Sequence, residues 1–341
     1  MNDDTVPHDL ADWSLHCFCI AARRTPEAVI RLDSNGSLLL AASHGIALGE
    51  LRERGLLVAD SQLLLLREFG LVEIEGDQVR TAFPILDPLT TTGIRAALRN
   101  DAARLVASWD AELAAIHRIL SDRNLRNHAF AIVFGYVLDG MLWTLLRYRR
   151  AVPETALTIE QPYWRGAFWA LWPPRQASAG TNELRTASAR LVMTWTPATA
   201  AALAHLARDP ALAADLLTSG MRAARGAAEI QTLHLQGTAD GDRWRVPAIR
   251  TGVDGPLAQA GGRMVLAIEA SLGESAGLDP ALRAAGVHDS KVATVILAHE
   301  LIWEIAELLV AERKVERPAV AVDASPSTAA LAELMFVAVD G

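Results

Sequence analysis

Short apolar blocks that end at glycines dominate the pattern from residue 35 to residue 86. Leucines recur at helical spacing in three of these blocks, which predicts three short helices, Ser37–His44, Ala47–Arg54 and Asp60–Phe69. Two further blocks, Leu71–Glu75 and Gln78–Pro84, alternate apolar and polar residues around Gly76-Asp77, the pattern of a tight hairpin. The pattern therefore predicts three helices followed by a two-stranded hairpin.

Longer helical patterns follow the hairpin and recur later in the chain. The predicted long helices are Ile94–Leu120, Asn127–Arg150, Leu257–Leu272 and Ser290–Arg313. After Arg317 the pattern predicts an extended run over Ala319–Val322, a turn and a final short helix from about Thr328. We therefore expect a mainly α fold with small β-hairpins, an α+β arrangement.

The first half of the chain matches the second half at a constant shift of 165 residues (202 − 37). Three blocks share this shift: Ser37–Leu51 over Ala202–Leu216, Leu51–Leu56 over Leu216–Met221 with Gly55 on Gly220, and Gly76–Arg80 over Gly241–Arg245. Self-similarity at a fixed offset indicates a duplication, and a fused duplication predicts a pseudo-two-fold arrangement, a dimer built into one chain.

The repeat divides the chain into two halves and an aromatic connector. We expect a first repeat at 1–150, with a helix-and-hairpin part at about 35–86 and a helical part at about 92–150. The connector is 151–183. The second repeat is 184–341, with corresponding parts at about 198–250 and 255–313 and a tail at 314–341.

The block Leu66–Glu73, LREFGLVE, joins the third predicted helix to the hairpin. Three short helices, this junction and the hairpin resemble the winged helix-turn-helix superfamily over about Asn35–Pro84, and the repeat extends the resemblance to 198–250. The second copy departs from the pattern because Leu235 stands where the first has Gly70. The resemblance implies that the third helix enters a major groove of double-stranded DNA while the hairpin, the wing, touches phosphate.

Polar side chains of the third helices, turns and wings are the candidate DNA contacts. They are Arg52, Arg54, Ser61, Gln62, Arg67, Arg80, Arg222, Arg225, Arg243 and Arg245. In the first copy, the third helix also contains the carboxylates Asp60 and Glu68, which would repel phosphate. An alternative therefore stays open in which the winged helices bind protein or have only a structural role.

Aromatic residues concentrate in the connector. On a helix, Trp164, Phe168 and Trp172 would form one stripe at i, i+4 and i+8. The stripe predicts either a core element between the two copies or one wall of a pocket for a planar hydrophobic small molecule.

Polar groups also interrupt the most apolar helices. Tyr136, Asp139 and Trp143 lie within two turns of one helix, and His299 and Trp303 share a face of another. Because Tyr136 falls on His299 in the repeat, we expect either a satisfied polar network that fixes the pairing of the halves or a ligand-sensing pocket.

Signals for catalysis, metals and cofactors are weak. His299-Glu300 begins like a zinc-protease HExxH motif, but Trp303 stands where the second histidine is needed. Neither a phosphate loop nor a complete metal set stands out, so we expect no cofactor and no metal. An enzyme that uses a pocket near Asp139 and His299 is the less favoured alternative.

Bulk properties complete the prediction. The chain has 341 residues, 51% of them hydrophobic, and a formal charge of −8, which disfavours coating by nucleic acid but allows a local basic face. Neighbours as close as Cys17 and Cys19 rarely form an unstrained disulfide, and the acidic start Met1–Asp4 lacks a signal-peptide pattern, so we expect a cytoplasmic protein. Ala129–Leu146 approaches transmembrane length, but Asp139 near its middle favours a buried helix.

Together these features predict a cytoplasmic, DNA-binding transcriptional regulator with no membrane partner. Its repeats would form a monomeric pseudo-dimer or a homodimer, and a small apolar effector between them would change the separation of the two winged helices.

Overall fold

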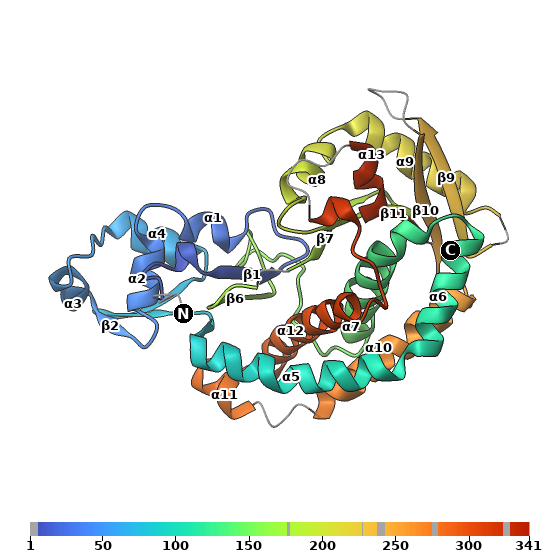
Figure 1. The fold of residues 1–341 in the computed structure, drawn as a ribbon. Coiled ribbons are helices and arrows are strands. Elements are labelled where there is room, and N and C mark those ends of the chain that lie inside the picture. Colours follow the sequence, from blue (N-terminus) through green and yellow to red (C-terminus); the bar gives the residue numbers. More distant parts are fainter. Residues whose placement is uncertain are drawn as a thin grey trace. The chain divides into compact units, whose positions relative to one another are not determined.

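The computed structural model describes residues 6–175, 178–226, 228–236, 243–274, 279–322 and 328–340 (Figure 1). The chain forms two compact units. Unit 1 combines residues 1–98, 150–176 and 274–300, and unit 2 combines residues 99–149, 177–273 and 301–341. Each unit therefore draws on both halves of the chain, and the expected division into halves does not describe its compact units.

The helix-and-hairpin part of unit 1 follows the predicted order. Its elements are α2 (Asn35–Ala41), β2 (Ile46–Ala47), α3 (Leu48–Glu53), α4 (Asp60–Glu68), β3 (Val72–Glu75) and β4 (Gln78–Thr81). The three strands form an antiparallel sheet in the order β2-β4-β3. The three short helices and the hairpin are thus confirmed, and the short strand β2 between the first two helices was not predicted.

Local sequence explains the hairpin and the helices before it. Gly76 has φ +64° at the turn between β3 and β4, a conformation that side chains with a Cβ rarely adopt. Leu38, Leu51 and Leu66, one from each helix, are fully buried in a common core. The helices are too short to be stable alone, so burial of these leucines provides most of their stability.

A second sheet of unit 1 contains β1 (Ser14–Phe18), β5 (Ile85–Leu86) and β6 (Ala167–Leu171), in the order β1-β6-β5. All five residues of β6 are buried, as a central strand requires. The aromatic connector therefore forms a strand here, and the helix expected over this stretch is wrong. Short and long helices complete unit 1: η1 (Leu10–Asp12), α1 (Pro26–Ile30), α11 (Asp279–Ala284) and the adjoining parts of α5 (Pro88–Ser108) and α12 (Ser290–Ala311).

Unit 2 is built on a five-stranded sheet. In the order β7-β8-β11-β10-β9, its strands are Gly180–Arg185, Ala189–Trp195, Met335–Asp340, Arg243–Thr251 and Ile230–Gln236. The β10–β11 pair is parallel and the other pairs are antiparallel. The short helix predicted from about Thr328 is α13 (Thr328–Leu331), and strand β11 after it was not predicted, because its continuous apolar run shows no alternation that distinguishes a buried strand from a helix.

Helices cover both faces of this sheet. Gly220 of α9 (Pro210–Ala223) lies against Val337, and Gly135 of the π-helix η3 (Ala131–Met141) lies against Phe336. Val337 and Phe336 are consecutive residues of β11 and point to opposite faces. A Cβ at position 220 would overlap Val337, and a Cβ at position 135 would overlap Oγ1 of Thr194 and crowd Phe336, so the sequence uses glycine for close packing.

Most of the remaining long helices of unit 2 are those predicted, but the extended run expected over Ala319–Val322 is wrong, because Ala319–Ala321 form a short 3-10 helix that buries Val320 and Ala321. The remaining helices are α6 (Asp110–Asp122), η2 (Arg126–His128), α7 (Leu142–Tyr148), α8 (Ala200–Leu206), α10 (Pro256–Glu274), η5 (Ala319–Ala321), α13 (Thr328–Leu331) and η6 (Ala332–Leu334). The helix expected over 94–120 is interrupted at Trp109, which separates α5 from α6. The helical segment 126–148 has the length and composition to cross a membrane, but 72% of its most apolar 18-residue window is buried inside the protein, as in a core helix.

The second helix-and-hairpin part, expected at 198–250, differs from the first. It consists of two helices, α8 and α9, and of strands β9 and β10 within the five-stranded sheet. The aligned glycines serve different purposes: Gly55 ends a helix with φ +80°, whereas Gly220 lies inside α9. Gly241 and Asp242, expected at the second hairpin turn, lie outside the described residues. In its described residues, the second part therefore lacks the order of three helices and a separate small hairpin sheet that the first part has.

Candidate functional site

The exposed surface of α4 and its flanking turns contains the first group of predicted DNA contacts. Ser61 and Arg67 are exposed, as DNA contacts must be. Gln62 has another role, because its Nε2 donates to Oδ1 of Asn35 at 2.7 Å and ties α4 to α2. The exposed face of α4 also includes Leu64, half of whose surface is accessible.

Arginines beside this helix are exposed, and two are paired with carboxylates. Arg54 forms an ion pair with Glu50 at 2.5 Å, and Arg80 of β4 forms one with Glu73 across the hairpin, also at 2.5 Å. Arg52 is exposed on α3. Over residues 26–86 the sequence has five arginines against nine carboxylates, so the positive groups lie on an acidic background.

The second group of predicted DNA contacts belongs to unit 2. Arg222 and Arg225 are exposed at the end of α9, and Arg245 is exposed on β10. The side chain of Arg243 lies outside the described residues. One face of α9 packs against the sheet, so α9 does not protrude from unit 2 as a recognition helix in a DNA major groove must.

Phe168 of the connector lies in the core of unit 1, and Trp164 and Trp172 are partly buried against that core. Phe168 packs edge-on against Phe83 and Trp164, with ring centroids 4.9 and 6.2 Å apart. Trp164 Nε1 donates to the Phe69 carbonyl, and Trp172 packs against Trp13. These contacts support the core interpretation rather than a pocket wall.

Asp139 is the centre of a satisfied polar group in unit 2. Its carboxylate accepts hydrogen bonds from Trp143 Nε1 at 2.7 Å and from Thr181 Oγ1 at 2.6 Å. Tyr136 packs against Phe336, and burial raises its pKa to about 12. Trp303 is buried and donates to the Ala179 carbonyl. The polar-network interpretation therefore describes Asp139 better than the ligand interpretation.

His299 belongs to unit 1, within a cluster of charged and aromatic side chains. Its neighbour Glu300 accepts from Arg95 Nε at 2.7 Å and from Arg175 Nη2 at 2.8 Å. Trp169 lies edge-on to the His299 ring and is stacked on His16. Burial, together with His299 and the two arginines, lowers the pKa of His16 to about 3, so this ring is neutral at pH 7.

Cys17 and Cys19, at the end of β1, are joined in a disulfide with their Cα atoms 5.5 Å apart. This separation is ordinary for a disulfide. The pairing differs from the expectation that two cysteines so close in sequence stay apart.

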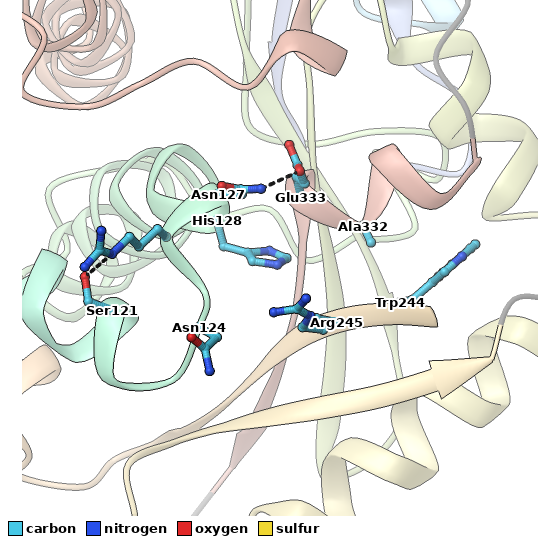
Figure 2. Close-up of a pocket in the computed structure, with 9 residues that line it drawn as sticks. Ser121, Asn124, Asn127, His128, Trp244, Arg245, Ala332 and Glu333 are labelled. Carbon is cyan, nitrogen blue, oxygen red and sulfur yellow. Dashed lines mark hydrogen bonds between the residues drawn. The ribbon is translucent and has the colours of Figure 1, made fainter. Parts of the chain in front are cut away.

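Unit 2 contains a polar pocket of about 470 Å³ that the sequence did not predict (Figure 2). Three segments far apart in the chain form it: the end of α6 with η2, the start of β10, and η6. Its polar residues are Ser121, Asn124, Arg126, Asn127, His128, Arg245 and Glu333, and Trp244 and Ala332 add apolar surface. Pockets of this volume accommodate small molecules.

Hydrogen bonds hold part of the pocket lining in place. Asn127 Nδ2 donates to Glu333 Oε1 at 2.9 Å, and Arg126 Nε donates to Ser121 Oγ at 2.8 Å. Among the described residues neither Arg126 nor Arg245 forms an ion pair. The pocket therefore holds two guanidinium groups and one carboxylate.

His128 lies at the inner side of this pocket, near Arg245 (Figure 2). Its residue is 4% exposed, and its Nδ1 is buried without a hydrogen-bond partner in the described part of the chain. Burial lowers the pKa of His128 to about 4, against the opposing effect of the carbonyls of Arg245 and Met335. The imidazole is therefore neutral at pH 7, with one ring nitrogen able to accept a hydrogen bond.

Sequence reasoning identified Arg245 but assigned it to DNA, and it missed the other pocket residues. The only local signal was the polar run Ser121–His128 between two apolar helices. Among the described residues, no group of three or more histidines, cysteines or carboxylates could hold a metal ion.

Comparisons of this chain with protein-family models, with curated proteins and with solved structures found no match. The functional interpretation therefore depends on the geometry of the chain itself.

Proposed function

We propose that this chain is a DNA-binding regulator of transcription that contacts duplex DNA through residues 35–86. The observation that supports the proposal is topological. A helix, a short strand, two helices and a two-stranded hairpin follow one another, and the strands pair in the order β2-β4-β3. This is the arrangement in which winged helix-turn-helix proteins present a recognition helix and a wing to DNA.

In this proposal α4 is the recognition helix and the β3–β4 hairpin is the wing. Ser61 and Arg67 would face the major groove, while Arg52 and Arg80 would contact phosphate. Gln62 has no place in the interface because it already binds Asn35. Under this proposal the chain is cytoplasmic and meets its DNA in the cytoplasm.

The acidic background sets the expected strength of binding. If the guanidinium groups of Arg52, Arg67 and Arg80 each displace about one counterion from the duplex, the logarithm of the binding constant should fall with the logarithm of salt with a slope near −3. Binding to random duplex DNA should thus be measurable at about 50 mM salt and nearly lost at about 200 mM.

Fluorescence anisotropy with a labelled random duplex tests this proposal. Arg67→Ala should weaken binding at low salt and reduce the slope by about one. Arg118→Ala, which removes the same charge from an exposed position of α6 in unit 2, is the matched control and should bind as the unsubstituted chain does. Failure of the folded chain to bind any duplex at about 50 mM salt would contradict the proposal.

One observation favours a second candidate, a winged-helix segment that binds a protein. Carboxylates outnumber arginines over residues 26–86, and Leu57 and Leu64 are 82% and 50% exposed. Apolar side chains on an acidic surface suit a protein partner better than phosphate. In the anisotropy experiment, equal and negligible binding by the chain, Arg67→Ala and Arg118→Ala would favour this candidate.

The small apolar effector expected from the sequence is not part of this proposal. It was placed between two winged helices, in a pocket lined by Tyr136, Asp139, Trp143, Trp164, Phe168, Trp172, His299 and Trp303. Among the described residues only 35–86 has the winged-helix order of elements, Phe168 lies in the core of unit 1 with Trp164 and Trp172 packed against it, and Asp139 is satisfied within unit 2.

A further inference from the structure

We propose that the polar pocket of unit 2 binds a small polyhydroxylated anion, of the class of sugar phosphates and sugar acids. The proposal concerns a site that is independent of the DNA-binding surface in unit 1. It follows from the volume of the pocket, its charge and the neutral polar groups of its lining.

Volume and lining exclude two other ligand classes. The pocket, at about 470 Å³, has room for a ligand of monosaccharide size with its charged group, which is more than an inorganic ion needs. Trp244 and Ala332 are the apolar residues of its lining, and the other seven are polar or charged. A planar hydrophobic molecule would leave most of the polar lining desolvated and unpaired, which is costly.

Charge identifies an anion as the ligand. Arg126 and Arg245 supply two guanidinium groups, and Glu333 supplies one carboxylate, while His128 is neutral. Guanidinium groups bind carboxylate and phosphate through paired, charge-assisted hydrogen bonds. Because the nitrogen Nε of Arg126 is already bonded to Ser121, its terminal Nη groups are the ones that remain for an anion.

Hydroxyl groups on the ligand explain the rest of the lining. Oε1 of Glu333 accepts from Asn127, and its other oxygen can accept from a ligand hydroxyl. Ser121 and Asn124 add a hydroxyl group and an amide group to the lining, and both groups can form hydrogen bonds with hydroxyl groups of a ligand.

Isothermal titration calorimetry on the full chain tests the proposal with four probes: glucose 6-phosphate, glucuronate, glucose and inorganic phosphate. At least one of the two sugar anions should bind, and glucose and inorganic phosphate should each bind at least tenfold more weakly. Binding by only the phosphorylated or only the carboxylated sugar would identify the source of the anionic group. If inorganic phosphate binds as tightly as the sugar anions, the hydroxyl groups add no affinity, and the proposal of a polyhydroxylated ligand is wrong.

Arg245→Ala assigns the binding to this pocket. Arg245 is exposed, so its replacement should leave the fold intact, as circular dichroism can verify. We expect the affinity for the sugar anion to fall at least tenfold. The matched control is Arg225→Ala, which removes an exposed arginine of unit 2 from outside the pocket and should leave the affinity unchanged.

Two results would overturn the proposal: no heat with any of the four probes at millimolar concentration, or equal losses in the two variants. Both are independent of DNA binding, because Arg245 and Arg225 lie in unit 2 and the proposed recognition helix lies in unit 1. The experiments can therefore refute the sugar-anion site without refuting DNA binding, and the reverse.

Discussion

At the scale of single residues, Glu300 shows how much depends on one buried charge. Its side chain is 2% exposed and lies between the guanidinium groups of Arg95 and Arg175, which are 15% and 5% exposed. Removing one partner of a buried ion pair leaves an uncompensated charge in a medium of low dielectric constant, and that costs about 3–5 kcal/mol. The cluster is therefore more sensitive to Glu300 than to either arginine alone.

We predict that Glu300→Gln lowers the free energy of unfolding of the chain by about 3 kcal/mol, because two arginines lose their shared counter-charge. Urea denaturation measures the change. Glu50→Gln is the control, since the Arg54–Glu50 pair is about half exposed on both sides and should contribute less than about 0.5 kcal/mol. Equal effects of the two substitutions would show that the Glu300 cluster is not a buried network.

At the scale of elements, the contact between α9 and β11 depends on a glycine. Gly220 faces Val337 at a distance that leaves no room for a Cβ, and the branched side chain of Val337 has little freedom to move. In contrast, Gly262 lies inside α10 with no neighbouring atom within 4 Å of where its Cβ would be. The two helices thus contain a glycine needed for packing and a glycine that packing does not need.

We predict opposite effects of the same substitution at these two positions. Gly220→Ala should lower the free energy of unfolding by about 1–3 kcal/mol through overpacking. Gly262→Ala should raise it by up to about 1 kcal/mol, because alanine is the better helix former. Thermal unfolding followed by circular dichroism measures both, and a stabilising Gly220→Ala would contradict the close contact of α9 with the sheet.

At the scale of the whole molecule, the compact units do not follow the order of the chain. Unit 1 needs residues 150–176 because they provide β6, the strand between β1 and β5. Phe168 and Ala170 of this strand are also part of the core that α2, α3 and α4 share. A fragment that ends before β6 therefore lacks both a central strand and part of a core.

We predict that the fragment 1–150, a complete first repeat by its sequence, does not fold alone, because β1 and β5 lose their common partner strand. Its amide proton NMR spectrum should be poorly dispersed, whereas co-expression with 151–341 should restore a dispersed spectrum. A well-dispersed spectrum of the isolated fragment would instead support the division of the chain into two autonomous halves.

Local patterns were enough for the elements of residues 35–86. Leucine spacing defined α2, α3 and α4, and alternation around Gly76 defined the hairpin. The same reasoning failed at β6 and β11, because a buried strand and a buried helix have the same continuous apolar composition. It also failed for α9, where an aligned glycine was needed for packing and not for a turn.

Local patterns were sufficient to predict α2, α3, α4, α10 and α12, the first hairpin and the burial of the helix at 131–148, because each depends on residues within a few turns of one another. Only the tertiary structure decided which strands share a sheet, that Asp139 is satisfied within its unit, and that residues 121–128, 244–245 and 332–333 surround one pocket. The physical reason is that partners separated by a hundred or more residues leave no periodic trace in the chain. Their proximity arises only when the sheet and its covering helices bury their apolar faces together.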